Sequence, residues 1–187
     1  MIIGLNGKMG VGKTEAVEII RRIHKDKEFE VVKFAQPLYD MQEFIYRRIK
    51  TVYARPDDFT KDRKLLQWLG TEWGRGTISE NIWIDLWREE VEFTRSNGTH
   101  VINDDTRFDN EAETIRALGG KVIQITSNRS ADRINTTSGI VDHSSEAGLT
   151  PGLVDAIITN NGTLDEFEEQ LKFALRNLGL NPSASSK

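Results

Sequence analysis

The sequence predicts an α/β domain in which a parallel sheet is covered by helices on both faces. Three observations lead to this fold class. Apolar runs of strand length alternate with helix-like stretches along the chain. The first strand leads directly into a glycine-rich loop and then an amphipathic run, the order strand, loop, helix. The chain has 187 residues, enough for one domain with its own core.

Five strands are predicted, at residues 2–6, 30–34, 100–103, 121–126 and 155–159. Six helices are predicted, at residues 13–24, 38–50, 61–70, 82–96, 110–118 and 164–178. Gly119 and Gly120 end the fifth helix, and Thr163 caps the sixth in capping-box register with Glu166. A single domain is therefore expected over residues 1–180, followed by a small, polar, flexible tail at 181–187.

The loop after the first strand has the spacing of a phosphate-binding P-loop. The residues expected to contact a donor nucleotide there are Gly7, Gly10, Val11, Gly12, Lys13 and Thr14. Glycines let backbone N–H groups converge on phosphate oxygens, and the following helix adds its positive end. Lys13 would reach the β- and γ-phosphates, and the Thr14 hydroxyl would bind a magnesium ion. A glycine turn that binds nothing can match by chance, but the flanking strand and helix favour the P-loop.

Composition excludes several classes of protein. The sequence has no cysteine, which excludes disulfides, thiolate zinc sites and cysteine nucleophiles. No stretch approaches the roughly 20 apolar residues of a membrane span, and the N-terminus is predicted to be a strand rather than a signal peptide. The net charge of −4 argues against binding long nucleic acid through the overall field. We therefore expect a cytoplasmic protein with neither a nucleic acid polymer nor a membrane as partner.

The connection between the second and third strands, residues 35–98, is far longer than a crossover helix requires. Residues 47–75 hold eight lysines and arginines against four acids, as a site for an anionic second substrate would. For most of these residues a solvated helix face is the better interpretation. Arg75 differs, because it is expected in a glycine-rich turn between Gly74 and Gly76. Trp83 and Trp87, one helical turn apart, are expected to pack in the core.

The third strand is predicted to end at Asn103, and two acids and an arginine follow it. A carboxylate at the end of a strand beside a P-loop orients magnesium or its bound water, so Asp104 or Asp105 should have this role. Spacing alone does not separate the two. Arg107 is close enough in sequence to enter the same crevice and pair with a phosphate.

Four stretches together resemble the bacteriophage deoxynucleoside monophosphate kinases: residues 34–38, 67–75, 105–112 and 142–146. The resemblance extends from the P-loop to the turn at 160–163. The P-loop is generic, whereas the Asp-x-Arg-Phe-x-Asn-Glu-Ala and Gln-x-x-Gly-Thr-x-x-x-Arg patterns are specific. Related patterns also occur in phosphomevalonate kinase. One departure is Tyr39, which stands where the family usually has a lysine.

The resemblance implies a P-loop NTPase fold, three-layer α/β/α, with a five-stranded parallel sheet, an inserted monophosphate-binding arm and a lid. The core would be residues 1–34 and 99–180, the arm about 35–98 and the lid about 127–139. Residues implied to bind the acceptor nucleotide are Gln67, Trp68, Arg75 and Asp104, and Asn161 would join the P-loop at the donor. Residues implied in catalysis are Lys13, Asp105, Arg107, Arg129 and Arg133, with Thr14 and Asp105 at the metal. The lid arginines are spaced to share one helix face.

The activity implied is ATP-dependent phosphorylation of deoxynucleoside 5′-monophosphates to diphosphates for dNTP synthesis, with ATP and Mg²⁺ as cofactors. A phosphomonoester has a second pKa near 6 and is largely ionised at neutral pH, so catalysis needs positioning and positive charge rather than a general base. The chain would act in the host-cell cytoplasm if phage-encoded and is compatible with a homodimer. Two alternatives are a P-loop kinase of another small phosphorylated acceptor, such as phosphomevalonate, and a nucleotide-binding switch protein; a switch would have no need of the basic arm.

Overall fold

The computed structural model describes residues 1–50, 62–128 and 148–181. Its centre is a five-stranded sheet in the order β2-β3-β1-β4-β5, in which every neighbouring pair is parallel. The strands are β1 (Ile2–Asn6), β2 (Phe29–Val31), β3 (His100–Thr106), β4 (Lys121–Thr126) and β5 (Ala156–Thr159). The predicted α/β class and the parallel sheet are confirmed.

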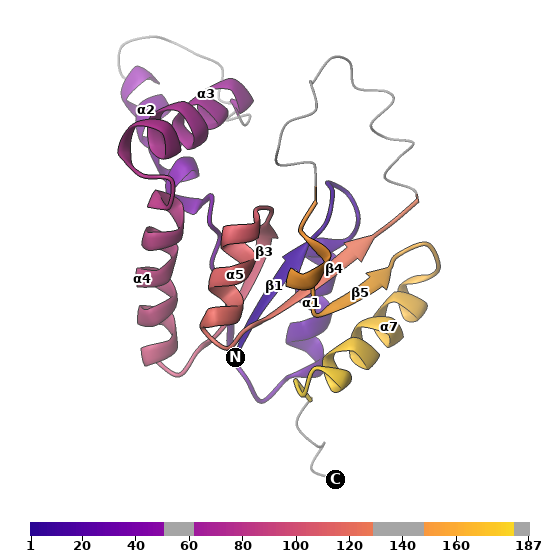
Figure 1. Cartoon of the computed structure of the whole chain (residues 1–187). Coiled ribbons are helices and arrows are strands. Elements are labelled where there is room, and N and C mark those ends of the chain that lie inside the picture. The colour runs from indigo at the N-terminus through magenta and orange to yellow at the C-terminus, as the bar shows by residue number, and fades with distance from the viewer. Residues whose placement is uncertain (51–61, 129–147, 182–187) are drawn as a thin grey trace.

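Helical segments lie in the described parts of the connections between the strands (Figure 1). The α-helices are α1 (Lys13–Ile23), α2 (Gln36–Lys50), α3 (Arg63–Trp68), α4 (Ile82–Ser96), α5 (Asp109–Ala117) and α7 (Leu164–Asn177). A π-helical segment, η1 (Leu69–Ile78), continues α3, and a short 3₁₀ turn, η3 (Pro151–Leu153), precedes β5. Among the described residues, no helix combines the length and apolar character needed to cross a bilayer.

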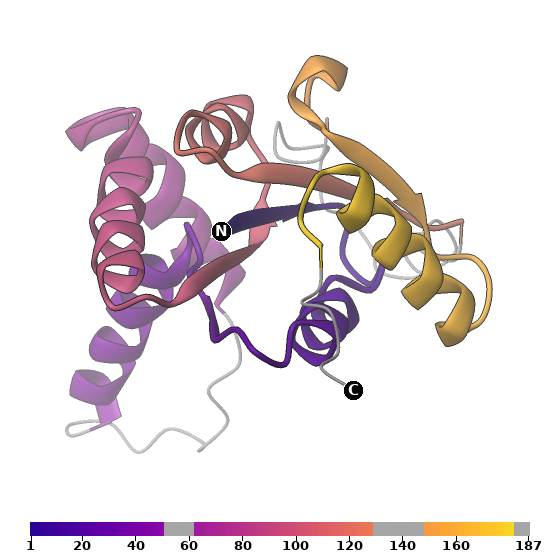
Figure 2. The ribbon, with the colours of Figure 1, turned by 90° about the horizontal axis from the view of Figure 1, so that it is seen from below.

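The sheet lies between two helical layers (Figures 1 and 2). On one face α1 and α7 bury a cluster that includes Ile19, Ile20, Phe167 and Leu171 against Ile3, Leu5 and Ile102. On the other face α4 and α5 bury Trp87, Val91 and Ile115 against Ile2, Val101 and Val122. Every residue of β1 is buried, as expected for a central strand covered on both faces. The three-layer arrangement predicted from the sequence is therefore confirmed.

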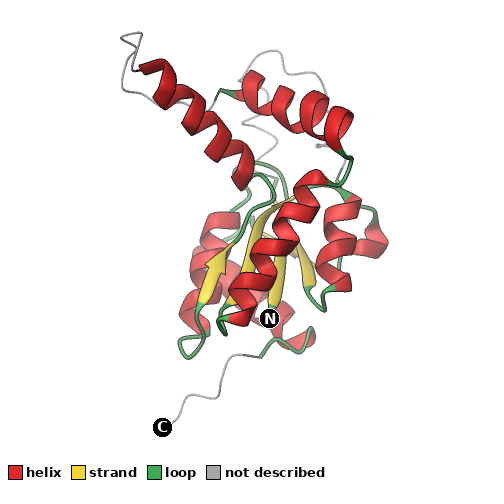
Figure 3. Ribbon diagram, turned by 90° about the vertical axis from the view of Figure 1, so that its left-hand side faces the viewer, coloured by secondary structure: helices red, strands yellow, loops and turns green. Residues whose placement is uncertain are grey.

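The arm stands above the carboxyl ends of the strands, with α2 and α3 projecting from the rest of the domain (Figure 3). The sequence-based boundary of 35–98 also placed α4 in the arm. In the structure α4 is a core helix, since Ile84, Trp87 and Val91 are buried against the sheet. The projecting part is thus limited to α2, α3 and η1. The expected packing of Trp83 and Trp87 in the core agrees with their exposures of 3% and 2%.

Two local expectations at the site are wrong. The third strand continues through Asp104 and Asp105 to Thr106, three residues beyond its predicted end. Its register with β1 is irregular there, because Gly4 pairs with Asn103 whereas Asn6 pairs with Thr106. The two aspartates therefore lie opposite one residue of β1, as in a β-bulge. Arg75 also lies within the helical segment η1 rather than in a glycine-rich turn.

Most of the predicted lid lies outside the described residues. Of residues 127–139, only 127 and 128 are described. Arg129 and Arg133, which were expected to act from the lid, lie outside the described residues, and so do the 142–146 stretch and the tail from 182 to 187.

Candidate functional site

The P-loop connects the carboxyl end of β1 to the start of α1. Gly7, Gly10 and Gly12 have φ angles of 149°, 82° and 106°, a region that favours glycine. A Cβ at Gly7 would also lie 2.4 Å from the carbonyl oxygen of Ile125, on β4. The loop therefore packs closely on the neighbouring strand, and its glycines are required by conformation and by space. This is the strand, loop and helix geometry that the sequence predicts.

The two polar residues after the glycines lie where the sequence analysis places them. The ammonium group of Lys13 donates to the carbonyl oxygens of Gly7, at 2.5 Å, and Lys8, at 3.0 Å. The lysine therefore reaches back across the loop, where it can meet phosphate oxygens bound by the loop amides. Thr14 is exposed in the first turn of α1. A threonine hydroxyl at this position of a P-loop is a ligand suited to magnesium.

Asn160 contacts the P-loop. The side-chain amide of Asn160 donates to the carbonyl oxygen of Val11 at 2.9 Å. A Cβ at Gly12 would lie 2.5 Å from the same amide nitrogen, so the two segments are closely packed. Asn161 accepts a hydrogen bond from the backbone N–H of Asn128 at 2.8 Å, and its expected role at the donor stays a prediction. Asn160 directly follows β5, and its position at the carboxyl edge of the sheet is the signal that could have identified it.

The carboxylate of Asp105 is occupied by the backbone that leads into the arm. It accepts hydrogen bonds from the N–H groups of Phe34, at 3.0 Å, and Ala35, at 2.9 Å, and from the side-chain amide of Asn103, at 2.8 Å. Burial raises the pKa of Asp105, and these three hydrogen bonds act in the opposite direction. Asp105 therefore attaches the start of the arm to β3. The metal contact that the resemblance implies for Asp105 stays a prediction.

One carboxylate oxygen of Asp104 has a partner, whereas the other has none among the described residues. Its Oδ2 lies 3.1 Å from the ammonium group of Lys33, and its side chain is 15% exposed. Its Oδ1 is buried and has no hydrogen-bond partner, a condition shared by no other buried side-chain nitrogen or oxygen in the described ranges. A buried acceptor without a partner is costly. Asp104 lies at the carboxyl end of β3, the strand that pairs with β1, and a carboxylate oxygen of this kind suits a hard cation such as magnesium.

Arg107 presents a cation at the same edge of the sheet. The residue is exposed and follows β3 directly. Its backbone N–H donates to Glu111 at 2.8 Å, which fixes the turn. Within residues 1–50, 62–128 and 148–181, no ion pair or hydrogen bond engages its guanidinium. Arg107 is therefore available to an anionic ligand, and its pairing with a phosphate stays a prediction.

Glu111 belongs to the family pattern at residues 105–112, but the sequence analysis assigns it no role. It is 3% exposed and lies in the first turn of α5. Its Oε2 accepts from the N–H groups of Arg107, at 2.8 Å, and Phe108, at 3.1 Å. Its Oε1 lies 3.0 Å from a guanidinium nitrogen of Arg75. Burial raises the pKa of Glu111 to about 7, against the opposing effects of these hydrogen bonds and of Arg75.

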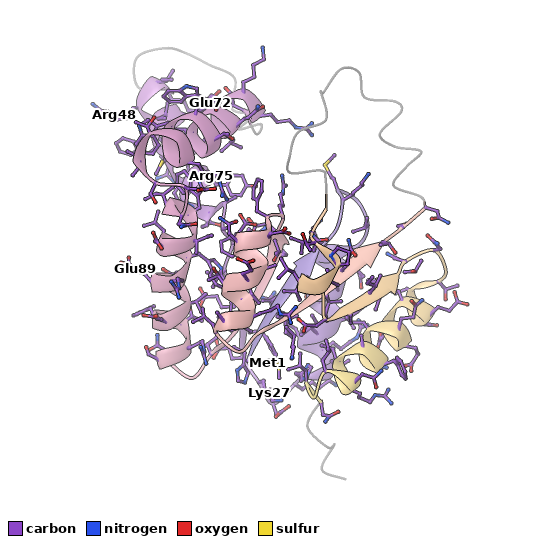
Figure 4. The ribbon with its side chains drawn as sticks, viewed as in Figure 1. Met1, Lys27, Arg48, Glu72, Arg75 and Glu89 are labelled. Carbon is purple, nitrogen blue, oxygen red and sulfur yellow. The ribbon has the colours of Figure 1, made fainter. Side chains whose placement is uncertain are left out.

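Arg75 joins the arm to the core. Its guanidinium carbon lies 4.4 Å from the centroid of the Phe108 ring, and Nη1 donates to the carbonyl oxygen of Glu80 at 3.3 Å. Figure 4 shows Arg75 where the arm meets the helices of the core. The other two residues expected at the acceptor, Gln67 and Trp68, lie on α3 with exposed side chains. The structure thus brings Arg75 to the strand ends and leaves Gln67 and Trp68 on the projecting arm.

Fold and site together define an α/β nucleotide-binding protein of the P-loop class. The family model described as deoxynucleotide monophosphate kinase matches residues 3–171. The chain belongs to the deoxynucleotide monophosphate kinase family.

Three curated relatives carry related names. The deoxynucleotide monophosphate kinase of Enterobacteria phage T4 is 31% identical over 132 residues, 70% of this chain and 52% of that protein. The enzyme of the same name in Escherichia phage RB69 is 30% identical over 132 residues, 70% of this chain and 51% of that protein. A putative deoxynucleotide monophosphate kinase of Acanthamoeba polyphaga mimivirus is 31% identical over 193 residues, 91% of this chain and 94% of that protein. The chain thus spans about half the length of the two phage relatives.

Replacing Asn160 by alanine should weaken binding of the donor nucleotide, because the P-loop loses the hydrogen bond to its Val11 carbonyl. A loss of about 1 kcal/mol corresponds to roughly a fivefold increase in Kd. Calorimetric titration with a non-hydrolysable ATP analogue and Mg²⁺ measures this change. Asn161→Ala is the matched control and should alter Kd less than about twofold. A larger increase in Kd for Asn161→Ala than for Asn160→Ala would indicate that Asn161, and not Asn160, supports donor binding.

Proposed function

We propose that the protein transfers the γ-phosphoryl group of ATP to deoxynucleoside 5′-monophosphates and yields the diphosphates. The observation that carries the proposal is the meeting of two cationic regions at one edge of the sheet. The P-loop with Lys13 is a donor site, and Arg75 of the arm reaches the turn that presents Arg107. Family membership supports phosphorylated nucleosides as the acceptors.

The chemistry that this geometry supports requires no general base. The acceptor phosphate is largely ionised at neutral pH, so the main obstacle is the approach of two anions. Lys13, in the loop after β1, and the exposed Arg107, after the neighbouring strand β3, supply positive charge at the strand ends. Arg129 and Arg133 are proposed to add charge from the lid, as the sequence analysis implies. The arm orients the acceptor, and its enclosure of the site reduces transfer to water.

Magnesium is proposed to be held by Thr14 and Asp104. The chemistry that the ion supplies when bound is neutralisation of charge on the transferring phosphates. The donor set fits a hard cation, because Asp104 offers an unpartnered carboxylate oxygen and Thr14 an exposed hydroxyl. Asp105 is less suited, since its carboxylate already accepts three hydrogen bonds. We therefore assign the metal contact to Asp104 instead of Asp105.

The activity is tested by incubating the protein with ATP, Mg²⁺ and each deoxynucleoside or ribonucleoside monophosphate, with phosphomevalonate in a parallel reaction. Diphosphate should form from at least one deoxynucleoside monophosphate. Lys13→Ala should lower kcat by about 100-fold or more, because a cation aimed at the transferring group is lost. Lys25→Ala, which changes an exposed lysine after α1, should retain wild-type turnover. Absence of diphosphate with every deoxynucleotide would refute the proposed activity.

The metal assignment predicts different defects for the two aspartate variants. Asp104→Asn should raise the Mg²⁺ concentration for half-maximal activity by about tenfold, since a charged ligand is lost. Asp105→Asn should keep the wild-type Mg²⁺ requirement and raise the acceptor KM, because it loosens the start of the arm. Activity measured over a Mg²⁺ series, with the acceptor KM at saturating Mg²⁺, separates the two. If only Asp105→Asn raised the Mg²⁺ requirement, the metal contact would belong to Asp105, as the resemblance implies, and not to Asp104.

A further inference from the structure

We propose that Glu111 is a positioning residue for the acceptor: its carboxylate, together with the Phe108 ring, holds the guanidinium of Arg75 against the start of α5, where the guanidinium binds the acceptor's phosphate. This inference rests on the proposed function and adds a residue to its acceptor site.

The two oxygens of Glu111 have separate partners. Oε2 accepts from the backbone N–H groups of Arg107 and Phe108 and so caps the first turn of α5. Oε1 lies 3.0 Å from Nη2 of Arg75, which comes from the arm. A neutral glutamine could perform the capping task, because both residues occur at this position of a capping box. A glutamine lacks the negative charge that attracts Arg75.

The contacts that hold Arg75 leave some of its guanidinium N–H donors without a partner among these contacts. Its side chain is 17% exposed and lies over the Phe108 ring at 4.4 Å. The contacts to Glu111 and to the carbonyl oxygen of Glu80 each use one guanidinium nitrogen. A guanidinium has five N–H donors in a planar fork, so donors remain for a phosphate.

The same carboxylate also fixes the turn that presents the second cation. The backbone N–H of Arg107 is bound to Glu111, and the exposed Arg107 side chain starts from this residue. Arg75 and Arg107 therefore reach the strand ends from different elements and depend on one buried group. A phosphate bound by both arginines would be placed at the edge of the sheet that carries the P-loop.

Protonation of Glu111 would weaken this arrangement. The charged groups that face it are Arg75 from η1 and Asp105 from β3, and burial raises its pKa to about 7. Above pH 7 the carboxylate is ionised and holds Arg75 as an ion pair. Below pH 7 the neutral carboxyl still caps α5 but attracts the guanidinium less. Acceptor binding should thus improve as the pH rises through about 7.

The test compares Glu111→Gln with the wild-type enzyme from about pH 5.5 to 8.5, with the acceptor KM and the ATP KM measured at each pH. The acceptor KM of the variant divided by that of the wild type should be near 1 at the acid end and rise to about tenfold at the alkaline end. The pKa of the acceptor phosphate is common to both enzymes and cancels in this ratio. The same ratio for ATP should stay near 1 throughout.

Glu113→Gln, an exposed change on the same helix, is the matched control and should give a ratio near 1 at every pH. A Glu111→Gln ratio that is independent of pH, or one that appears equally for ATP, would overturn the proposal in favour of a purely structural role. Wild-type turnover with deoxynucleotides is measured in the same series. A failure of the proposed function would therefore be seen separately, as absence of product.

A second measurement needs no variant. In wild-type protein with ¹³C-labelled glutamate carboxyl groups, one carboxyl should titrate near pH 7. Because an ionised Glu111 favours the acceptor, saturation with the acceptor should lower this midpoint by more than about half a pH unit. An unchanged midpoint in the acceptor complex would contradict the proposal even if Glu111→Gln failed to fold.

Discussion

The arrangement of the site depends on the carboxylate of Asp105 and the two backbone N–H groups that it accepts. These groups belong to Phe34 and Ala35, and α2 begins at the next residue, Gln36. The carboxylate lies at the end of β3, so the hydrogen bonds fix the start of the arm to the strand that leads to the site. Asn103 completes the link, since its side-chain amide donates to Asp105 and to the Val32 carbonyl oxygen. A half-buried carboxylate with three donors is a specific anchor for a chain leaving a sheet.

The other end of the arm is attached by different chemistry. The indole N–H of Trp83, on α4, donates to the carbonyl oxygen of Gly70 at 2.8 Å. A Cβ at Gly74 would lie 2.2 Å from the Trp83 ring, so η1 can pack on α4 only with glycine there. Arg75 then pairs with Glu111 on α5. The arm is thus held at its start by Asp105 and at its end by Trp83 and Glu111, and both attachments lie above the carboxyl edge that carries the P-loop.

Much of this could be predicted from local sequence signals. The structure confirms the predicted strands at 2–6 and 121–126 and the predicted P-loop. These predictions rest on apolar periodicity and glycine spacing, which are local properties of the sequence. The extension of β3 was missed because aspartates disfavour strands. Tertiary partners compensate for this, Lys33 at Asp104 and the N–H groups of Phe34 and Ala35 at Asp105. The separation of Asp104 from Asp105 depends on the register with β1, which spacing does not contain. The role of Glu111 could not be predicted from local signals either, because its partner Arg75 is distant in sequence.

Amide hydrogen exchange in Asp105→Asn tests most directly whether this carboxylate anchors the arm. Exchange at Phe34 and Ala35, and through α2 and α3, should become about 10-fold faster or more, because the asparagine cannot accept both N–H groups as the carboxylate does. Exchange in α1 and β4 should remain at the wild-type rate, and Asp104→Asn should leave Phe34 and Ala35 unchanged. Wild-type exchange at Phe34 and Ala35 in Asp105→Asn, or an equal acceleration across the whole domain, would contradict the anchoring role.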